Sequence, residues 1–386
     1  MQDFVHLHVH SHYSILDGQA SIQKLVDKAI KDGMRGIAIT DHGNMFGIKE
    51  FWNYVKKKNG ARRDKVKQTS AAVAELQAVI DGGEASEEQK SELAKLKAEL
   101  DSLPKEDFKA IIGCEVYVAR RRLFNREKAM GDYSGYHLIL LAKDKRGYKN
   151  LIKIVSKAYT EGSYGRPRTD RVELEKYKEG LIVCSACLGG EVPRMITRDM
   201  LSEAEEAIQW YKSTFGDDYY LELQLHKATV ARANHEAYEL QLKVNEKLIE
   251  YSKKYGIGLV CTNDVHFVNE EHAEAHDRLI CLTTNANLDD PDRLRYTQQE
   301  YLKSEEEMLD LFYKHPETLS NTLEVADKIE SYKVDKDPIL PKFDLPEEFL
   351  ADIDTYQERY RHIIDEGRCD KNGNERGEEF CNSVAF

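Results

Sequence analysis

The sequence lacks the features that mark membrane, secreted and disulfide-linked proteins. No run of about 18 or more apolar residues occurs in the chain, so no membrane-spanning helix is expected. The N-terminus lacks a basic start followed by an apolar stretch, so no signal peptide is indicated and we expect a cytoplasmic location. The seven cysteines are scattered and odd in number, which favours reduced thiols over a disulfide framework.

Positive charge is in deficit overall, because the formal net charge is -13. This argues at first against a polyanionic partner, but basic residues gather locally, and local potential matters more than the total. Ordinary solvated helix faces and loops explain any single cluster about as well as a polyanionic partner does. The clusters are Lys56, Lys57, Lys58, Arg62, Arg63, Lys65 and Lys67; Arg120, Arg121, Arg122, Arg126 and Lys128; and Lys143, Lys145, Arg146, Lys149, Arg166, Arg168 and Arg171.

Short apolar runs alternate with helical periodicity along most of the 386 residues, of which 41% are hydrophobic. This alternation predicts an α/β fold of about seven βα units with a mostly parallel sheet, open or closed into a barrel. In such barrels the functional groups lie at the C-terminal ends of the strands. The expected strands are 4–9, 36–40, 110–119, 136–142, 180–186, 219–225 and 257–262, and the clearest helices are 21–31, 146–158, 202–214 and 235–254.

Residues 58–107 interrupt the alternation. Apolar residues at helical spacing precede Gly82-Gly83, and Ser86-Glu87-Glu88-Gln89 has the pattern of a capping box before a second helix that closes at Pro104. We expect a helical hairpin inserted in the barrel. Its narrow apolar stripe suits two helices that pack on each other.

The chain begins with a cluster of histidines. His6, His8, His10 and His12 fall within a stretch of seven residues that alternates with Leu and Val. In a strand, alternate side chains point one way, so His6, His8 and His10 are expected to share a face. Imidazole is the commonest protein ligand for zinc and related metals, whereas an expression tag would be an uninterrupted run. The sequence therefore predicts a metal site.

Nearly every expected strand also delivers a residue type that binds metals. Imidazoles, carboxylates and one thiolate can together hold several divalent cations, and a carboxylate such as Glu115 can bridge two of them. Each position alone has a plain structural explanation, such as a core histidine, a helix cap or a small buried cysteine. The candidate ligands are His8, His10, Asp17, His42, Glu115, His137, Cys187, Asp264 and His266.

The cysteine pair Cys184-Ser185-Ala186-Cys187 has two further interpretations, a zinc ribbon or a redox pair. Both are weak, because the chain contains no second Cys-x-x-Cys and no thioredoxin-like context. We expect Cys187 to be the ligand and Cys184, which falls within a strand, to pack in the core.

Several motifs resemble those of the PHP (polymerase and histidinol phosphatase) metallohydrolases, and more closely the N-terminal PHP domain of bacterial C-family replicative polymerases, the DNA polymerase III alpha subunits. The general motifs are His8-Val9-His10-Ser11, Ile39-Thr40-Asp41-His42-Gly43, Gly113-Cys114-Glu115-Val116-Tyr117 and Asn263-Asp264-Val265-His266. The closer match adds Tyr13-Ser14-Ile15-Leu16-Asp17-Gly18, residues 136–162, Arg166-Pro167-Arg168 and Cys187-Leu188-Gly189-Gly190-Glu191. The resemblance covers nearly the whole chain except the inserted hairpin.

This resemblance implies a distorted (β/α)7 TIM-like barrel with a trinuclear metal centre. The nine candidate ligands all match the family pattern, whereas His6 and His12 lie outside it. We expect about three divalent ions per chain: zinc, manganese or both, with iron or magnesium as the alternatives. Asp264, His266 and Glu115 are the expected catalytic residues, and Arg166 and Arg168 are expected to bind the phosphates of nucleic acid.

The resemblance also implies how the chain is divided. We expect residues 1–275 to form the metallo-phosphoesterase barrel, with residues 58–107 as its inserted hairpin, and residues 276–386 to form a connecting segment that leads into a polymerase palm region. The palm aspartates of the family lie beyond the last residue of this sequence. The chain is therefore expected to be a fragment that does not polymerise DNA itself.

Two functions of different classes remain open. As an enzyme, the domain would use metal-activated water to hydrolyse a phosphate ester, and a 3′–5′ exonuclease that proofreads during DNA replication fits best. As a binding module, it would be a metal-stabilised platform for the polymerase core, DNA or a proofreading subunit. The complete ligand set favours the enzyme, because a structural zinc site needs only four ligands. A free-standing PHP phosphatase is less favoured. The expected partners are DNA and other replicase subunits, with the sliding clamp reached through the missing parts of the parent, and no membrane.

Overall fold

The computed structural model describes residues 4–83 and 85–336. The chain divides into two compact units, Met1–Val334 and Asp335–Phe386, and the fold described below is that of the first unit. The part of the expected connecting segment beyond residue 336 lies outside the described residues. The division between residues 275 and 276 stays a prediction.

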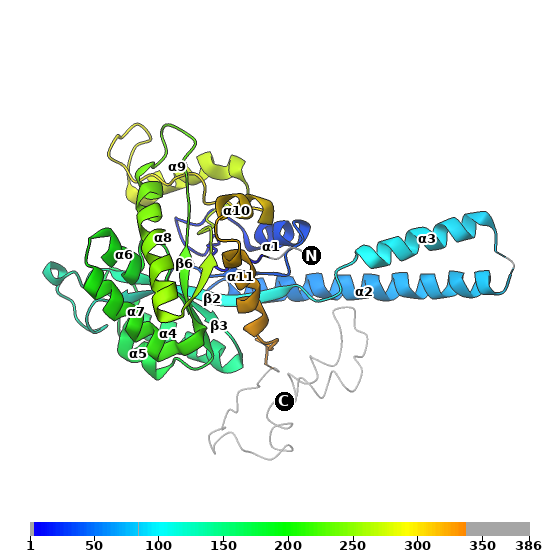
Figure 1. The fold of residues 1–386 in the computed structure, drawn as a ribbon, viewed down its shortest axis with the longest axis horizontal. Helices are drawn as coiled ribbons and strands as arrows, with labels where there is room; N and C mark the ends of the chain where they lie inside the picture. Colours follow the sequence, from blue (N-terminus) through cyan, green and yellow to red (C-terminus); the bar gives the residue numbers. More distant parts are fainter. Residues whose placement is uncertain (1–3, 84, 337–386) are drawn as a thin grey trace, which may run out of the picture. The chain divides into compact units, whose positions relative to one another are not determined.

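A curled seven-stranded sheet lies at the centre of the first unit (Figure 1). Its strand order is β1-β2-β3-β5-β6-β7, and the short β4 pairs with β2. Most strands are short runs of aliphatic and aromatic residues buried along their length, as expected when both faces of a sheet are covered. Their bounds are β1 (Gly36–Ile39), β2 (Lys109–Ala119), β3 (Gly135–Ala142), β4 (Arg168–Thr169), β5 (Leu181–Cys184), β6 (Tyr219–Leu223) and β7 (Gly258–Cys261).

The expectation of a mostly parallel sheet is confirmed with one exception, strand β3, which runs antiparallel to both β2 and β5. The other pairings are parallel. A parallel neighbour requires a crossover, usually a helix. The connection between β2 and β3, residues 120–134, contains only the 3-10 turn η1 (Lys128–Met130), so the chain turns back instead. The first residues of β3 therefore lie beside the last residues of β2.

The expected first strand, residues 4–9, is not a regular strand but connects the two edges of the sheet. On one side the amide of Ala38 donates to the carbonyl of His6 (2.9 Å), and on the other the amide of His10 donates to the carbonyl of Val265 (2.7 Å). Ladder pairing is incomplete because the amide of Val9 donates to a side chain, the hydroxyl of Thr40 (2.9 Å). With this segment the sheet forms a distorted TIM-like barrel.

Helices cover the sheet, and the four clearest helices expected from the sequence are confirmed to within a few residues. Side-chain caps fix several starts; the carboxylate of Asp144, for example, accepts from the amide of Gly147 (2.7 Å). No helix among the described residues is long and apolar enough to cross a membrane. The helices are α1 (Ile22–Lys31), α2 (Ile48–Asp81), α3 (Glu87–Ser102), α4 (Lys145–Thr160), α5 (Arg171–Lys176), α6 (Glu191–Thr197), α7 (Leu201–Phe215), α8 (Glu236–Tyr255), α9 (Ala273–Thr284), α10 (Glu305–Leu311) and α11 (Glu317–Lys328), with 3-10 turns η2 (Gly216–Asp218) and η3 (Glu270–His272).

Helices α2 and α3 lie side by side (Figure 1), and the expected capping box at Ser86 and Gln89 is present. The first arm is longer than expected, because α2 runs without a break from the core at Ile48 into the hairpin. Asn59 closes the base of the hairpin: its side chain donates to the carbonyl of Phe108 (2.9 Å) and accepts from the amide of the same residue (2.8 Å).

Candidate metal centre

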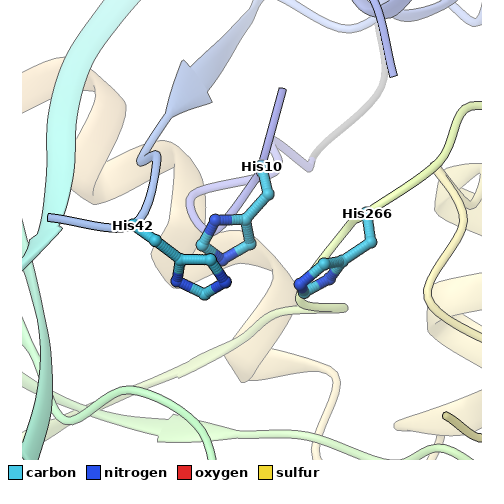
Figure 2. Close-up of side chains that lie close together, drawn as sticks. All are labelled: His10, His42 and His266. Atoms are coloured by element: carbon cyan, nitrogen blue, oxygen red, sulfur yellow. The ribbon is translucent and has the colours of Figure 1, made fainter. Parts of the chain in front are cut away.

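A cavity of about 530 Å³ opens at the rim where β3 begins and the parallel strands end. The antiparallel course of β3 brings His137, at its start, to the same rim as residues that follow β1, β5 and β7. Figure 2 shows three imidazoles that point toward one another there. The centroid of the His10 ring lies 3.9 Å from that of His42 and 4.5 Å from that of His266. Six of the predicted ligands line the cavity: Asp17, His42, His137, Cys187, Asp264 and His266.

The structure brings all nine predicted ligands together. Eight of them form three groups, two of which share His10, and within each group the ligand atoms lie within 4.8 Å of one another. Asp17 joins them through His42, since its carboxylate lies 2.9 Å from the Nε2 atom of that ring. The groups are His8, His10 and Asp264; His10, His42 and His266; and Glu115, His137 and Cys187.

Glu115 connects these groups. It lies within β2 and is fully buried, and its Oε1 atom is 2.8 Å from Nδ1 of His137 and 3.4 Å from Nε2 of His8. Its second oxygen contacts Nδ1 of His42. Burial alone would raise the pKa of Glu115, but the imidazoles of His137 and His42 outweigh burial and hold that pKa well below its usual range. The carboxylate is therefore ionised and placed as a bridging ligand would be.

The rings of His8 and His10 are oriented by hydrogen bonds on their far sides. Nδ1 of His8 lies 2.6 Å from the carboxylate of Glu222, and Nδ1 of His10 lies 3.0 Å from the hydroxyl of Ser14. That hydroxyl donates to Asp41 (2.8 Å), so it accepts from His10. Each ring thus donates from Nδ1, and the two Nε2 atoms, 3.1 Å apart, both face the centre, where they can act as metal ligands.

Asp264 adds a third acceptor at the same point. Its Oδ1 atom lies 3.0 Å from Nε2 of His8 and 3.2 Å from Nε2 of His10. The Nε2 atom of His266 is buried and has no hydrogen-bond partner among the described residues, while its Nδ1 atom bonds to the carbonyl of Asp264 (2.7 Å). Imidazole nitrogens and a carboxylate oxygen that converge in this way fit a divalent metal.

Protonation is strongly perturbed in this centre. Burial lowers the pKa of His8, but the carboxylates of Asp264 and Glu222 outweigh burial and hold the pKa well above its usual value. Burial also lowers the pKa of His10, and the neighbouring His42 and His266 lower it further, to about 3. The carboxylates thus favour positive charge at this point, and a bound divalent ion would supply it in place of a proton on Nε2 of His8.

Cys187 lies at the cavity and Cys184 does not. The Sγ atom of Cys187 is 3.6 Å from Nδ1 of His137, whereas Cys184 lies in β5 and is fully buried in the apolar core. Burial raises the pKa of the Cys187 thiol, and the carboxylates of Asp264 and Glu115 raise it further, so a bound cation is needed to hold the thiolate. A Cβ atom on Gly189 would lie only 2.9 Å from the His137 ring, so glycine allows the loop after Cys187 to approach that ligand.

The sequence did not single out the residues that support the ligands. Tyr296 donates through its hydroxyl to Asp17 (2.9 Å), and the buried Nε2 atom of His276 lies 3.9 Å from the same carboxylate. Glu222 orients His8 from the middle of a fully buried strand. The charge of Glu222 was the available signal, because a carboxylate inside an apolar strand is rare unless it is paired.

The two arginines expected to bind phosphate have different surroundings. Arg166 is exposed, lines the cavity, and stacks over the ring of Tyr117 at 5.6 Å. Arg168 is fully buried, and its guanidinium donates to backbone carbonyls that include those of Leu123 (2.8 Å) and Gly162 (3.0 Å). The expectation for Arg168 is therefore corrected: its donors hold loop backbone and do not face a ligand.

Comparison with known proteins decides the family. A model described as "PHP domain" matches residues 6–226, which is more than half of the chain. The chain belongs to the PHP domain family. This PHP domain is also similar to curated proteins named DNA polymerase III subunit alpha: it is 39% identical to that of Borreliella burgdorferi over 94% of this chain and 26% of that protein, and 38% identical to that of Treponema pallidum over 95% of this chain and 26% of that protein.

A relative from Thermus aquaticus with the same name is 36% identical over 89% of this chain and 24% of that protein. The PHP domain chain thus spans about a quarter of the length of these relatives. A solved amidohydrolase from Chromobacterium violaceum is 12% identical, with a TM-score of 0.34, over 69% of this chain and 88% of that chain. So distant a likeness carries no functional argument.

Proposed function

We propose that this PHP domain is a divalent-metal phosphoesterase that removes nucleotides from the 3′ end of DNA as part of a replicative polymerase. The observation that supports it best is the convergence of Nε2 of His8, Nε2 of His10 and Oδ1 of Asp264, which lie 3.0–3.2 Å from one another. The nine ligand atoms extend over more space than one ion fills, so we expect about three ions of zinc, manganese, iron or magnesium.

Bound divalent ions would lower the pKa of water and stabilise the charge that develops on a phosphoryl group. The residues of the chain supply the rest of the site. Glu115 would bridge ions as an ionised carboxylate, and Asp264 and His266 would fix the geometry at the open side of the cavity, where a phosphate ester enters. Arg166, held over Tyr117, would bind the phosphate.

The relatives support the biological setting. They are named as alpha subunits of DNA polymerase III, so we propose DNA as a partner, together with other subunits of a cytoplasmic replicase. The chain corresponds to about a quarter of those proteins, and polymerisation is assigned to the remainder of the parent. We propose that this domain contributes only hydrolysis.

A structural role for the metals is the second candidate. It is favoured by the complete burial of His8, His10 and Glu115, because closed and buried ligand sets are typical of sites that stabilise a fold. In that case the domain would be a platform for the polymerase core or for a proofreading subunit.

Incubation of the manganese- or zinc-loaded protein with DNA labelled at its 5′ end distinguishes the two candidates. We expect slow shortening from the 3′ end that requires added metal and is lost in Asp264→Asn/His266→Ala. The control Asp217→Asn/His315→Ala changes the same residue types outside the cavity and should retain activity. Activity that survives the first double variant would indicate a contaminating nuclease, and fully metallated protein without activity on any phosphate ester would leave the structural role.

A further inference from the structure

Three arginines beside the metal cavity have no acidic partner among the described residues. Arg194 lines the cavity, and Arg198 follows one helical turn later, at the end of α6. Arg120 comes directly after β2, where Ala119 pairs with Gly135, itself a residue of the cavity wall. The guanidinium of Arg120 stacks over the ring of Tyr136 at 5.4 Å. We call these three residues the arginine cluster.

The acidic residues close to the cluster in sequence are already paired with other cations. In a chain of net charge -13, carboxylates are abundant, so a group of arginines without ion pairs is unusual. The neighbouring pairs are Glu191 with Arg171 at 2.9 Å, Asp199 with Lys243 at 2.6 Å and Glu127 with Arg121 at 3.1 Å. The positive charge of the arginine cluster is therefore not neutralised by an acidic side chain among the described residues, and it is available to an anionic ligand.

Helix electrostatics do not account for the cluster. Positive charge at the C-terminal end of a helix is favourable, which would explain Arg194 or Arg198 alone. Like charges four residues apart repel, however, and Arg120 belongs to a different segment altogether. Burial lowers the pKa of Arg194, and the charges of Arg198 and Arg120 lower it further, so a bound anion would relieve repulsion at this point.

An exposed aromatic residue in the loop that begins with Arg120 indicates which polyanion fits. Tyr133 is 53% exposed and immediately precedes Ser134 and Gly135 of the cavity wall. The centroid of its ring lies 5.5 Å from that of Tyr164, edge to face, and the Nζ atom of Lys128 lies over the Tyr133 ring at 5.5 Å, so a base would have to displace this flexible side chain or stack on the other face. Exposed rings next to arginines are typical of surfaces that bind single-stranded nucleic acid, because bases stack on the rings while the cations follow the phosphates. An acidic peptide would have no use for the stacking surface.

We infer that the arginine cluster binds successive phosphates of a single DNA strand whose end lies in the metal cavity, with a base stacked on Tyr133. The inference rests on the proposed function for the identity of the ligand but concerns binding alone. It makes Arg120, Arg194 and Arg198 determinants of substrate class: they favour a polynucleotide strand over an isolated phosphate.

Binding of a fluorescent single-stranded oligonucleotide, measured by anisotropy on the whole chain at a series of salt concentrations, tests the inference. Each phosphate contact on a single strand contributes roughly 0.7 to the slope of log affinity against log salt, so Arg120→Gln/Arg194→Gln/Arg198→Gln should reduce the slope by about 2. Raising salt from about 50 to 200 mM should then weaken DNA binding by the unsubstituted chain about 20-fold more than DNA binding by the triple variant. Tyr133→Ser should lower affinity at every salt concentration and leave the slope unchanged, because a tyrosine ring carries no charge.

Arg146→Gln is the matched control. Arg146 pairs with Glu179 (2.8 Å), which precedes β5, so this charge lies at the opposite end of that strand from Cys187. The control should keep the parent slope, and metal content should be equal in all variants.

An unchanged slope in the triple variant would overturn the inference, as would a slope reduced equally by Arg146→Gln. Competition by polyglutamate as strong as that by an oligonucleotide of equal charge would assign the cluster to an acidic protein segment and also overturn it. Weaker DNA binding by the triple variant, together with no hydrolysis by the unsubstituted chain, would retain the inference and reject only the proposed exonuclease.

Discussion

At the scale of single residues, the metal centre depends on side chains that face away from the cavity. Glu222 accepts from Nδ1 of His8 and thereby directs Nε2 toward the centre. Glu222→Gln keeps an acceptor but removes its charge, so we expect metal affinity to fall about 10-fold or more, measured by competition with a chelator dye. Glu324→Gln, at an exposed carboxylate on α11, is the control. Equal affinities in the two variants would contradict a supporting role for Glu222.

The two cysteines close in sequence should behave differently. Cys187→Ser should reduce metal content, because the thiolate is the proposed ligand, whereas Cys184→Ser should keep the metal and lose about 1–3 kcal/mol of stability by burying a hydroxyl in the apolar core. Elemental analysis and thermal unfolding of both variants separate these effects. The opposite pattern would refute the assignment.

Lys303 should make stability depend on pH. It is almost fully buried, and burial lowers its pKa from 10.5 to about 8. Below about pH 8 Lys303 is protonated in both the folded and the unfolded protein, so the free-energy cost of burying its ammonium group is fully present. Between about pH 8 and 10.5 only the folded protein releases this proton, so the cost is relieved and the protein becomes more stable. Lys303→Met should therefore be more stabilising at pH 7 than at pH 10.5, by about 3 kcal/mol. Urea unfolding at both pH values measures this difference, and equal effects would exclude a buried ammonium.

At the scale of elements, the inserted hairpin should be dispensable to the barrel. Among the described hairpin residues after Asn59, 60–83 and 85–103, the only buried side chains are those of Thr69 in α2 and Leu93 in α3. Replacing residues 64–103 with a short Gly-Ser linker should leave metal content unchanged, whereas Asn59→Ala should destabilise the protein by about 1–3 kcal/mol because both backbone groups of Phe108 lose their partner. A deletion variant that binds no metal would give the hairpin a role in the centre.

Sequence periodicity locates most elements but not their direction. Strands β5 and β7 are apolar runs between turns, and they lie where periodicity predicts them. The reversal of β3 leaves no mark in its own composition, because a buried strand has the same apolar sequence in either direction. It follows instead from the missing crossover helix in residues 120–134, which hold only a short 3-10 turn.

Ligand types could be predicted from the sequence better than side-chain directions. The alternation of His6, His8 and His10 predicted one shared face, yet Nε2 of His6 bonds to the carbonyl of Lys303 (2.8 Å), away from the centre. The reason is that the segment is not a regular strand. Arg168 likewise looked like a phosphate ligand by charge, and only burial shows that its donors hold backbone carbonyls.

At the scale of the whole molecule, metal should stabilise the barrel as a unit. The proposed ligands follow or lie within β1, β2, β3, β5 and β7, and His8 and His10 lie in the segment that connects the first and last strands. Bound ions would tie these elements together, so chelation should lower the midpoint of thermal unfolding, and added manganese or zinc should restore it. Elemental analysis should give about three ions per chain beforehand. An identical midpoint with and without chelator, in protein shown to hold metal, would mean that the ions contribute nothing to folding.

Because β3 runs against its neighbours, the loop of residues 120–134 begins and ends at the cavity rim. In a regular βα barrel, a loop at this rim continues into a helix that leads the chain to the opposite rim, so a change in loop length disturbs the packing of that helix. Here an insertion among the exposed residues 126–130 would lengthen only the rim itself, while Arg168 holds the loop at Leu123 and Asp132 and the pairing of Ala119 with Gly135 holds the register. The loop is therefore a place where new recognition sequences can be grafted, and where specificity can diverge between relatives without rebuilding the barrel.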